Sequence, residues 1–209
     1  MEDVLDVYHR PYDPARPQVC LDESSKQLLA HTRIPIAASP GTPARIDDEY
    51  KRCGTANIFA AIEPVTGKSV VDVTESRTAM DMAHFLRRIS DEEYPAATAI
   101  VLVMDNLNIH SLSCLYEAFE PREARRLVER FEVHHTPKHG SWLNVAEIFL
   151  STMARRVPRS AHRHHGRPPL AHCCMAVLTV QWEGHVALHH RRRTYQAAPA
   201  LPVHSIDSG

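Results

Sequence analysis

A run of apolar residues that stops on an acid places the strongest limit on how this chain can fold. Residues Ile100 to Met104 read IVLVM, with no polar residue among them. A short, continuous apolar run rich in β-branched residues is typical of a strand that is buried on both faces of a sheet. Helices cover both faces of such sheets, so the run favours an α/β domain. Asp105 follows directly, and the carboxyl end of a buried strand is where reactive groups commonly lie.

The order of the other segments also predicts a mixed α/β sheet flanked by helices. In chain order the pattern predicts a short strand ending at Asp22, a hairpin over 55–73, a helix over 78–88, the strand 99–104, helices over 112–119 and 121–131, a strand over 131–137 and a helix over 143–156. Thr78 and Ser141 are the predicted N-caps, and Pro121 suits the first turn of its helix. Residues 26–55 are expected to be mostly loop with short strands.

Composition narrows the classes of protein that fit. The 209 residues, 44% hydrophobic, suffice for one well-buried domain with an appendage. A net charge of −1 gives no global attraction for nucleic acid, so any basic surface must be local. Five cysteines without a C-x-x-C pair argue against a disulfide framework and against a zinc ribbon. The acidic N-terminus does not resemble a signal peptide and no apolar run is long enough for a membrane span, so we expect a soluble, cytoplasmic protein.

Three acids stand out as candidate metal ligands. Asp22 and Asp105 each close a predicted strand. Glu147 falls on a helical stripe that is otherwise apolar, formed with Leu143, Leu150 and Ala154. Convergent carboxylates suit Mg²⁺ or Mn²⁺, and two such ions can hold the attacking and leaving oxygens of a phosphodiester. Spacing alone leaves a plainer reading open, in which the aspartates are turn residues and the glutamate lies on the surface.

Local sequence around these acids resembles one family. The segments CLDES (20–24), VLVMDNLNIH (101–110) and HHTPKHGSWLNVAEIF (134–149) resemble the three acidic motifs of the mariner-like superfamily of DDE transposases, in its bacterial insertion-sequence branch. The block TPKHGSWLNVAE is the most specific of them. The resemblance implies a ribonuclease H-like fold and DNA cleavage followed by strand transfer at the ends of an insertion sequence.

The resemblance also assigns roles to residues. It makes Asp22, Asp105 and Glu147 the catalytic acids and the ligands of two Mg²⁺ ions, for which Mn²⁺ can substitute. The other implied site residues would support the metal ligands or contact DNA: Asn106, His110, Lys138, His139, Trp142, Asn144, Arg155 and Arg156. The implied partners are double-stranded DNA, as transposon ends and target, and a second copy of the chain. A nucleoid-associated location would follow.

The two ends of the chain are expected to lie outside the catalytic domain. We predict a linker-like segment over 1–17, the catalytic domain over 18–157 and an irregular tail over 158–209, rich in His, Arg and Pro. The chain resembles a copy truncated at its N-terminus. The tail is open to three interpretations, namely a metal-binding tract, a basic DNA-binding tail, or out-of-frame coding after a frameshift near Val157, which we favour.

Two alternatives to an active transposase remain at this point. One is a catalytically silent fragment that binds DNA or an intact transposase. The other is a different ribonuclease H-like nuclease, such as a junction resolvase, against which the block TPKHGSWLNVAE argues.

Overall fold

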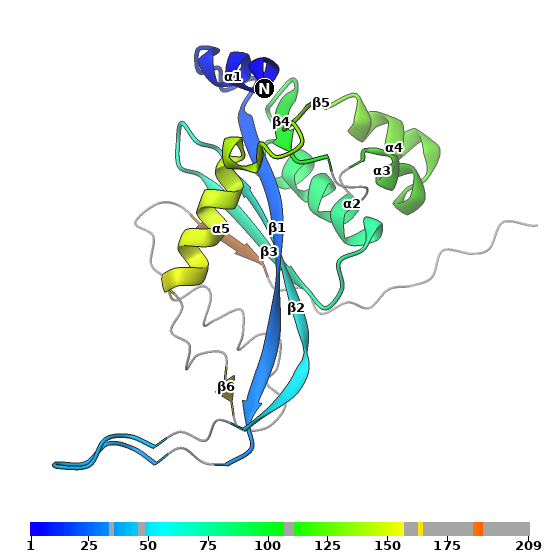
Figure 1. The fold of residues 1–209 in the computed structure, drawn as a ribbon. Helices are drawn as coiled ribbons and strands as arrows, with labels where there is room; N and C mark the ends of the chain where they lie inside the picture. The colour runs from blue at the N-terminus through cyan, green and yellow to red at the C-terminus, as the bar shows by residue number, and fades with distance from the viewer. Residues whose placement is uncertain (34–35, 46–48, 107–110, 157–162, 165–185, 190–209) are drawn as a thin grey trace, which may run out of the picture.

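A mixed β-sheet forms the centre of the computed structural model, which describes residues 1–33, 36–45, 49–106, 111–156, 163–164 and 186–189 (Figure 1). The strands are β1 (Gln18–His31), β2 (Tyr50–Ile62), β3 (Ser69–Thr74), β4 (Ile100–Met104), β5 (Phe131–His135), β6 (Arg163–His164) and β7 (Val186–His189). Their order is β5-β4-β1-β2-β3-β7, and β6 pairs with β1. β2 is antiparallel to both of its neighbours, whereas β1, β4 and β5 run parallel. The predicted mixed α/β sheet is therefore confirmed.

Helices cover both faces of this sheet. They are α1 (Glu2–His9), α2 (Ala79–Arg88), α3 (Ser113–Ala118), α4 (Pro121–Val128) and α5 (Val145–Arg156), with a π-helical turn η1 (Ile89–Glu93) and a 3₁₀ turn η2 (Ser141–Leu143). α2, α3 and α4 pack on one face, and α1 and α5 lie on the other (Figure 1). None of the described helices is long and apolar enough to cross a membrane.

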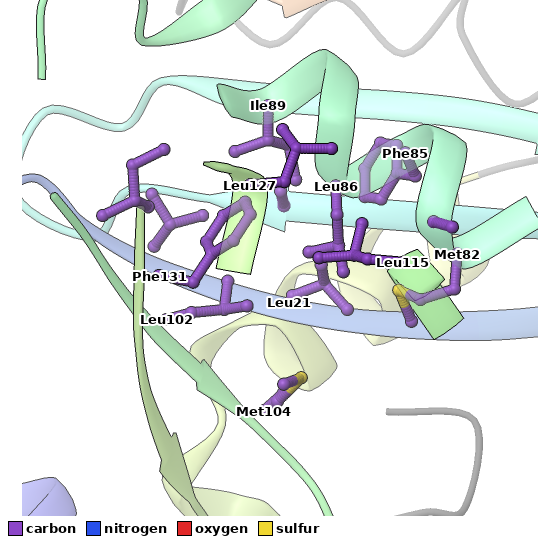
Figure 2. Packing of buried hydrophobic residues seen from close by; sticks show 14 of the residues in the cluster. Leu21, Met82, Phe85, Leu86, Ile89, Leu102, Met104, Leu115, Leu127 and Phe131 are labelled. Atoms are coloured by element: carbon purple, nitrogen blue, oxygen red, sulfur yellow. The ribbon is translucent and has the colours of Figure 1, made fainter. Parts of the chain in front are cut away.

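Strand alternation explains why both faces are apolar. In β4, Ile100, Leu102 and Met104 enter the cluster under α2, α3 and α4, while Val101 and Val103 enter the cluster under α1. All five side chains are at most 1% exposed. Figure 2 shows the first cluster, in which side chains of α2 and α4 meet those of the sheet. The prediction that this strand is buried on both faces is confirmed.

Local signals in the sequence predicted several element boundaries correctly. The hairpin is formed by β2 and β3, which are paired from Asn57–Thr74 to Ile62–Ser69. Thr78 caps α2 in a capping box with Asp81, and Pro121 occupies the first turn of α4.

The segment expected to be mostly loop is instead a long two-stranded ribbon. β1 continues to His31 and pairs antiparallel with β2 back to Tyr50, with one irregularity between Gln27 and Leu29. Isolated bridges join Ile36 to Arg45 and Ser39 to Thr42 farther out. In Figure 1 this ribbon extends away from the helices. Asp22 consequently lies inside a long strand, not at the end of a short one.

The segment expected to be linker-like contains a helix that packs onto the domain. α1 buries Val4 and Val7 completely against a cluster that includes Cys20 and Val103. The linker prediction is therefore wrong for Glu2–His9. Val4, Val7 and Tyr8 have helical spacing, but the prolines at 11, 14 and 17 favoured the interpretation as a linker.

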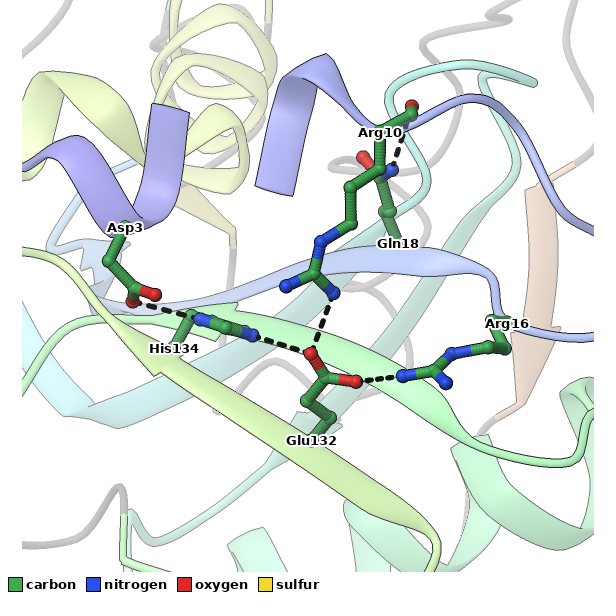
Figure 3. Close-up of polar contacts among 6 residues, drawn as sticks. All are labelled: Asp3, Arg10, Arg16, Gln18, Glu132 and His134. Carbon is green, nitrogen blue, oxygen red and sulfur yellow. Dashed lines mark hydrogen bonds and ion pairs between the residues drawn. The ribbon is translucent and has the colours of Figure 1, made fainter. Parts of the chain in front are cut away.

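Polar contacts hold the same N-terminal segment against β5. Arg10 and Arg16 both donate to the carboxylate of Glu132, and the His134 ring joins that carboxylate to Asp3 of α1 (Figure 3). Gln18 adds a contact to the Arg10 carbonyl at 3.4 Å. The N-terminal segment thus has both an apolar and an ionic attachment to the sheet.

Little of the tail is described. Its described residues form β6, which pairs with Leu29 and Ala30 of β1, and β7, which runs parallel to β3. The rest of the predicted irregular tail lies outside the described residues, so the frameshift interpretation remains a prediction.

Candidate active site

Asp22 and Asp105 lie on neighbouring parallel strands. The register of β1 and β4 pairs Gln18 with Val101 and ends with Cys20 beside Val103. Asp22 and Asp105 each follow two residues after that last pair, so they continue the same register at the edge where β4 stops. Both residues are half-buried. The backbone N–H of Glu23 donates to Asp22 Oδ1 at 2.8 Å, which helps to orient this carboxylate.

The end of β5 encloses Asp105 from the other side. β5 pairs with β4 up to Met104 beside His135, and the Thr136 N–H then donates to the Met104 carbonyl at 2.9 Å. His135 Nδ1 lies 3.3 Å from the Asp105 carbonyl oxygen. We did not select His135 from the sequence. Its position as the last residue of a strand next to the one that ends on Asp105 is the signal that could have identified it.

Glu147 lies on the predicted helix, but this helix begins later than expected and the Glu147 side chain is more exposed than expected. α5 begins at Val145, so Glu147 lies in its first turn, and its side chain is exposed. The buried side of the helix is formed by Ala146, Phe149 and Leu150. The prediction of an inward stripe shared with Leu143 is wrong, because Leu143 belongs to the separate turn η2 and does not share the helical phase of α5.

Asn144 joins this helix to the strand that carries Asp22. Its side-chain oxygen accepts from the Ala146 N–H at 3.1 Å, and its side-chain nitrogen donates to the Leu21 carbonyl at 2.9 Å. The first of these bonds is that of an N-cap. Ser141 was the predicted cap, but it opens η2, where no side-chain capping bond is formed.

The loop between β5 and α5 presents several polar and aromatic groups. Lys138, His139 and Trp142 are exposed, and Trp142 retains 63% of its accessible surface. His139 has a φ of 66°, a left-handed conformation. A Cβ atom on Gly140 would lie 2.6 Å from Cγ of Pro137, so the turn has no space for a larger residue there. The loop therefore has a defined shape beside Asp105 and the start of α5.

Four other predicted site residues add less to the description of the site. Asn106 follows Asp105 and is exposed. His110 lies outside the described residues. Arg155 and Arg156 are the final two residues of α5, at the opposite end of that helix from Glu147.

The acids have the chemistry of a divalent-cation site but do not form a closed ligand set. Carboxylate oxygens are the ligands that Mg²⁺ and Mn²⁺ prefer. Among the described residues, no three His, Cys, Asp or Glu side chains lie close enough together to hold a metal ion. Like charges repel, so close approach of three carboxylates requires cations between them. Strand register places Asp22 and Asp105 on neighbouring strands, where they could share a cation. Whether Glu147 could join them depends on how α5 is placed against β1.

The fold and these acids define an α/β domain with a paired-carboxylate edge, as expected of a metal-dependent nuclease. The profile of the family described as DDE superfamily endonuclease matches residues 17–166, more than half of the chain. The chain therefore belongs to the DDE superfamily endonuclease family, and the predicted membership in a DDE family is confirmed.

Comparison with solved structures gives mariner transposases. The "Mos1 transposase paired-end complex with left transposon end" is 16% identical with a TM-score of 0.48, over 78% of this chain and 47% of that one. The "Crystal structure of the Mos1 mariner paired end complex with Mn" is 17% identical with a TM-score of 0.46, over 74% and 46%. This chain thus spans about half the length of those chains. A comparison with curated proteins gives no match.

Proposed function

We propose that this chain is the catalytic domain of a transposase that cleaves DNA at the ends of an insertion sequence and joins the cut ends to a target. The observation that carries the proposal is the placement of Asp22 and Asp105 on adjacent strands, next to a helix that carries Glu147, in a member of the DDE superfamily endonuclease family. The block TPKHGSWLNVAE supports a bacterial element. Because its DNA substrate would lie in the nucleoid of a bacterial cell, we propose that the protein acts in the cytoplasm at the nucleoid.

In this proposal the three acids would hold two divalent cations, Mg²⁺ or Mn²⁺ in its place. When bound, the cations activate the attacking oxygen and stabilise the leaving oxygen of a phosphodiester. Water attacks first and leaves a 3′-hydroxyl, which then attacks a second phosphodiester in the target. The chain itself must hold two DNA segments in line with the acids, because orientation contributes much of the rate in such displacements.

The exposed loop before α5 suits the DNA backbone. Lys138 and His139 are exposed in the loop that follows β5 and can donate to phosphate oxygens. Trp142 adds an exposed aromatic surface in the same loop. Since the overall charge is only −1, such a local contact must supply the attraction for DNA. Two transposon ends require two active sites, so we propose that the chain acts as a homodimer on DNA.

Thermal unfolding with and without millimolar Mn²⁺ tests the metal site. A ligand that binds only the folded state raises the midpoint by mass action, so the native chain should gain stability with Mn²⁺. Asp105→Asn should abolish this gain. Asp91→Asn is the matched control, since Asp91 is an acid of η1 that pairs with Arg126 away from the site. No Mn²⁺-dependent rise in the native chain would contradict the metal site.

Cleavage of duplex DNA from the ends of the element tests the activity. The native chain should nick this DNA with Mg²⁺ or Mn²⁺, and Asp22→Asn, Asp105→Asn and Glu147→Gln should each lose the activity. A second candidate is a silent subunit that binds DNA or intact transposase, and the exposed position of Glu147 favours it. That candidate predicts DNA binding in all three variants and no cleavage by any of them or by the native chain.

A further inference from the structure

Asn144 is a buried amide whose two polar groups bond to two different elements. The residue is 1% exposed. Nδ2 donates to the Leu21 carbonyl of β1, and Oδ1 accepts from the Ala146 N–H of α5. A buried amide with both ends bonded resists displacement, because breaking either bond leaves a buried polar group without a partner.

The partners of Asn144 are next to two of the catalytic acids in sequence. Leu21 precedes Asp22, and Ala146 precedes Glu147. The Asn144 backbone carbonyl also accepts from the Glu147 N–H at 3.1 Å. Asn144 is thus bonded to Glu147 itself and to the residue before Asp22.

The bond to β1 is more than a helix cap requires. An N-cap needs only a side-chain acceptor, and Ser or Asp would supply one. The amide nitrogen of Asn144 instead donates to Leu21, the first residue after the last register pair between β1 and β4. It therefore attaches the start of α5 to β1 at the point where the pairing between β1 and β4 ends.

The residues on either side of Asn144 are held as well. Leu143 and Ala146 are buried at 4% and 0% exposure in the cluster that contains Val4 and Val7 of α1. The Tyr8 hydroxyl donates to the Leu143 carbonyl at 2.7 Å. The start of α5 is therefore packed from the side of α1 and bonded to β1, while Glu147 remains exposed.

We propose that Asn144 is a positioning residue that sets the separation between the Asp22 and Glu147 carboxylates. Its meaning for catalysis rests on the proposed function, whereas its effect on the placement of α5 can be measured independently of that function. The decisive variant is Asn144→Ser, since serine keeps an acceptor for the Ala146 N–H but is too short to reach Leu21. Asn144→Asp is the second variant, which also keeps the acceptor and loses the donor.

The first measurement is the distance distribution between nitroxide labels on exposed positions of the two elements, Gln27→Cys on β1 and Ile148→Cys on α5. Cys53, Cys173 and Cys174 are replaced by Ser in this background, and the buried Cys20 and Cys114 remain. Asn57→Ala is the matched control. Asn57 of β2 is also a buried amide, 5% exposed, and its Oδ1 accepts from the Ser25 hydroxyl of β1 at 2.6 Å. Its neighbours Ala56 and Ile58 pack in the cluster with Phe149 of α5, so strand alternation places Asn57 on the opposite face of the sheet.

Asn144→Ser should shift or broaden the distribution, and Asn57→Ala should leave it unchanged. An unchanged distribution in a folded Asn144→Ser chain overturns the proposal. If Asn144→Ser does not fold, the same readout on Asn144→Asp decides it. If neither variant folds while Asn57→Ala does, Asn144 is required for folding as a whole and the proposal of a positioning role is overturned.

The second measurement is the Mn²⁺ concentration that gives half of the thermal stabilisation. A positioning role predicts a midpoint about 10- to 100-fold higher in folded Asn144→Ser, with no change in Asn57→Ala. If the distance distribution changes in Asn144→Ser but the Mn²⁺ midpoint does not, Asn144 positions α5 without affecting the metal site. That result overturns its role in catalysis and leaves a structural role. If the native chain does not respond to Mn²⁺ at all, the proposed function fails. The label distances alone then support or overturn the role of Asn144 in positioning α5 against β1.

Discussion

The hydroxyl of Tyr8 donates a 2.7 Å hydrogen bond to the backbone carbonyl oxygen of Leu143, the last residue of η2. The same hydroxyl lies 3.2 Å from the Cys20 sulfur on β1. One side chain of α1 therefore contacts both the central strand and the turn that leads into the helix of Glu147. This makes the N-terminal helix part of the structure that places the candidate active site.

Replacement of Tyr8 by phenylalanine tests this contact. Burial, and next the adjacent Cys20, raise the pKa of Tyr8 above its ordinary value, so the hydroxyl stays protonated and remains a donor. Tyr8→Phe should lower the free energy of unfolding by about 1–3 kcal/mol, since it leaves the Leu143 carbonyl without this partner. Urea denaturation measures the change. Tyr12→Phe, at a residue 50% exposed, is the control and should be neutral; equal stability of the two variants would contradict the prediction.

The ionic attachment of the N-terminal segment should make stability depend on pH. Hydrogen bonds from Arg10, and then from His134, lower the pKa of Glu132 from 4.5 to about 2. A carboxyl whose folded pKa is depressed contributes stability that is present above pH 4.5 and is lost as the pH falls toward 2.

Glu132→Gln should remove this contribution. The arginine partners are 40% and 50% exposed, so solvent screening limits the effect at neutral pH to about 1 kcal/mol. The difference between the native chain and Glu132→Gln should shrink between pH 4.5 and pH 2. Unfolding free energies across this range check it, and Glu129→Gln, in the exposed Arg125 pair, is the control. A constant difference between the two chains would rule out the assigned cause.

The elements predicted correctly are those that short-range signals specify. The apolar run of β4 and the Thr78 cap of α2 each depend on neighbours within a few residues. The length of β1 could not be predicted in this way. Ser24, Ser25 and Lys26 are polar, but the strand continues through them because β2 supplies partners for the backbone.

The geometry of the candidate site could not be predicted from short-range signals. Asp22 and Asp105 are placed on neighbouring strands by register, which depends on a pairing between distant segments. The capping role of Asn144 was missed because Ser141 is an equally good N-cap residue by type. Only the break between η2 and α5 distinguishes the two, and this break follows from contacts with α1 and β1.

The turn before α5 provides a direct test of the revised cap assignment. Ser141→Ala should change the free energy of unfolding by less than about 0.5 kcal/mol, because Ser141 is exposed and makes no capping bond. Gly140→Ala should cost about 1–3 kcal/mol, since its Cβ would meet Pro137 at 2.6 Å. Chemical denaturation of the two variants compares them. A larger loss in Ser141→Ala than in Gly140→Ala would restore the original assignment.

Lys138, which is exposed in the loop between β5 and α5, should make DNA affinity more dependent on salt concentration. Each phosphate contact made by a cation releases counterions, so the logarithm of the affinity falls with the logarithm of salt concentration in proportion to the contacts. Lys138→Ala should therefore weaken binding to duplex DNA and reduce the magnitude of this slope by about one. Fluorescence anisotropy at several salt concentrations measures both quantities.

The control is Arg125→Ala, which removes another exposed cation, on α4, that is paired with Glu129. The two variants change the net charge of the chain by the same amount, so a nonspecific effect of charge would lower both slopes equally. A contact at the site lowers only the slope of Lys138→Ala, because only this side chain lies in the loop between β5 and α5. Equal slopes in all three chains would place the DNA backbone elsewhere on the surface and separate the loop from substrate binding.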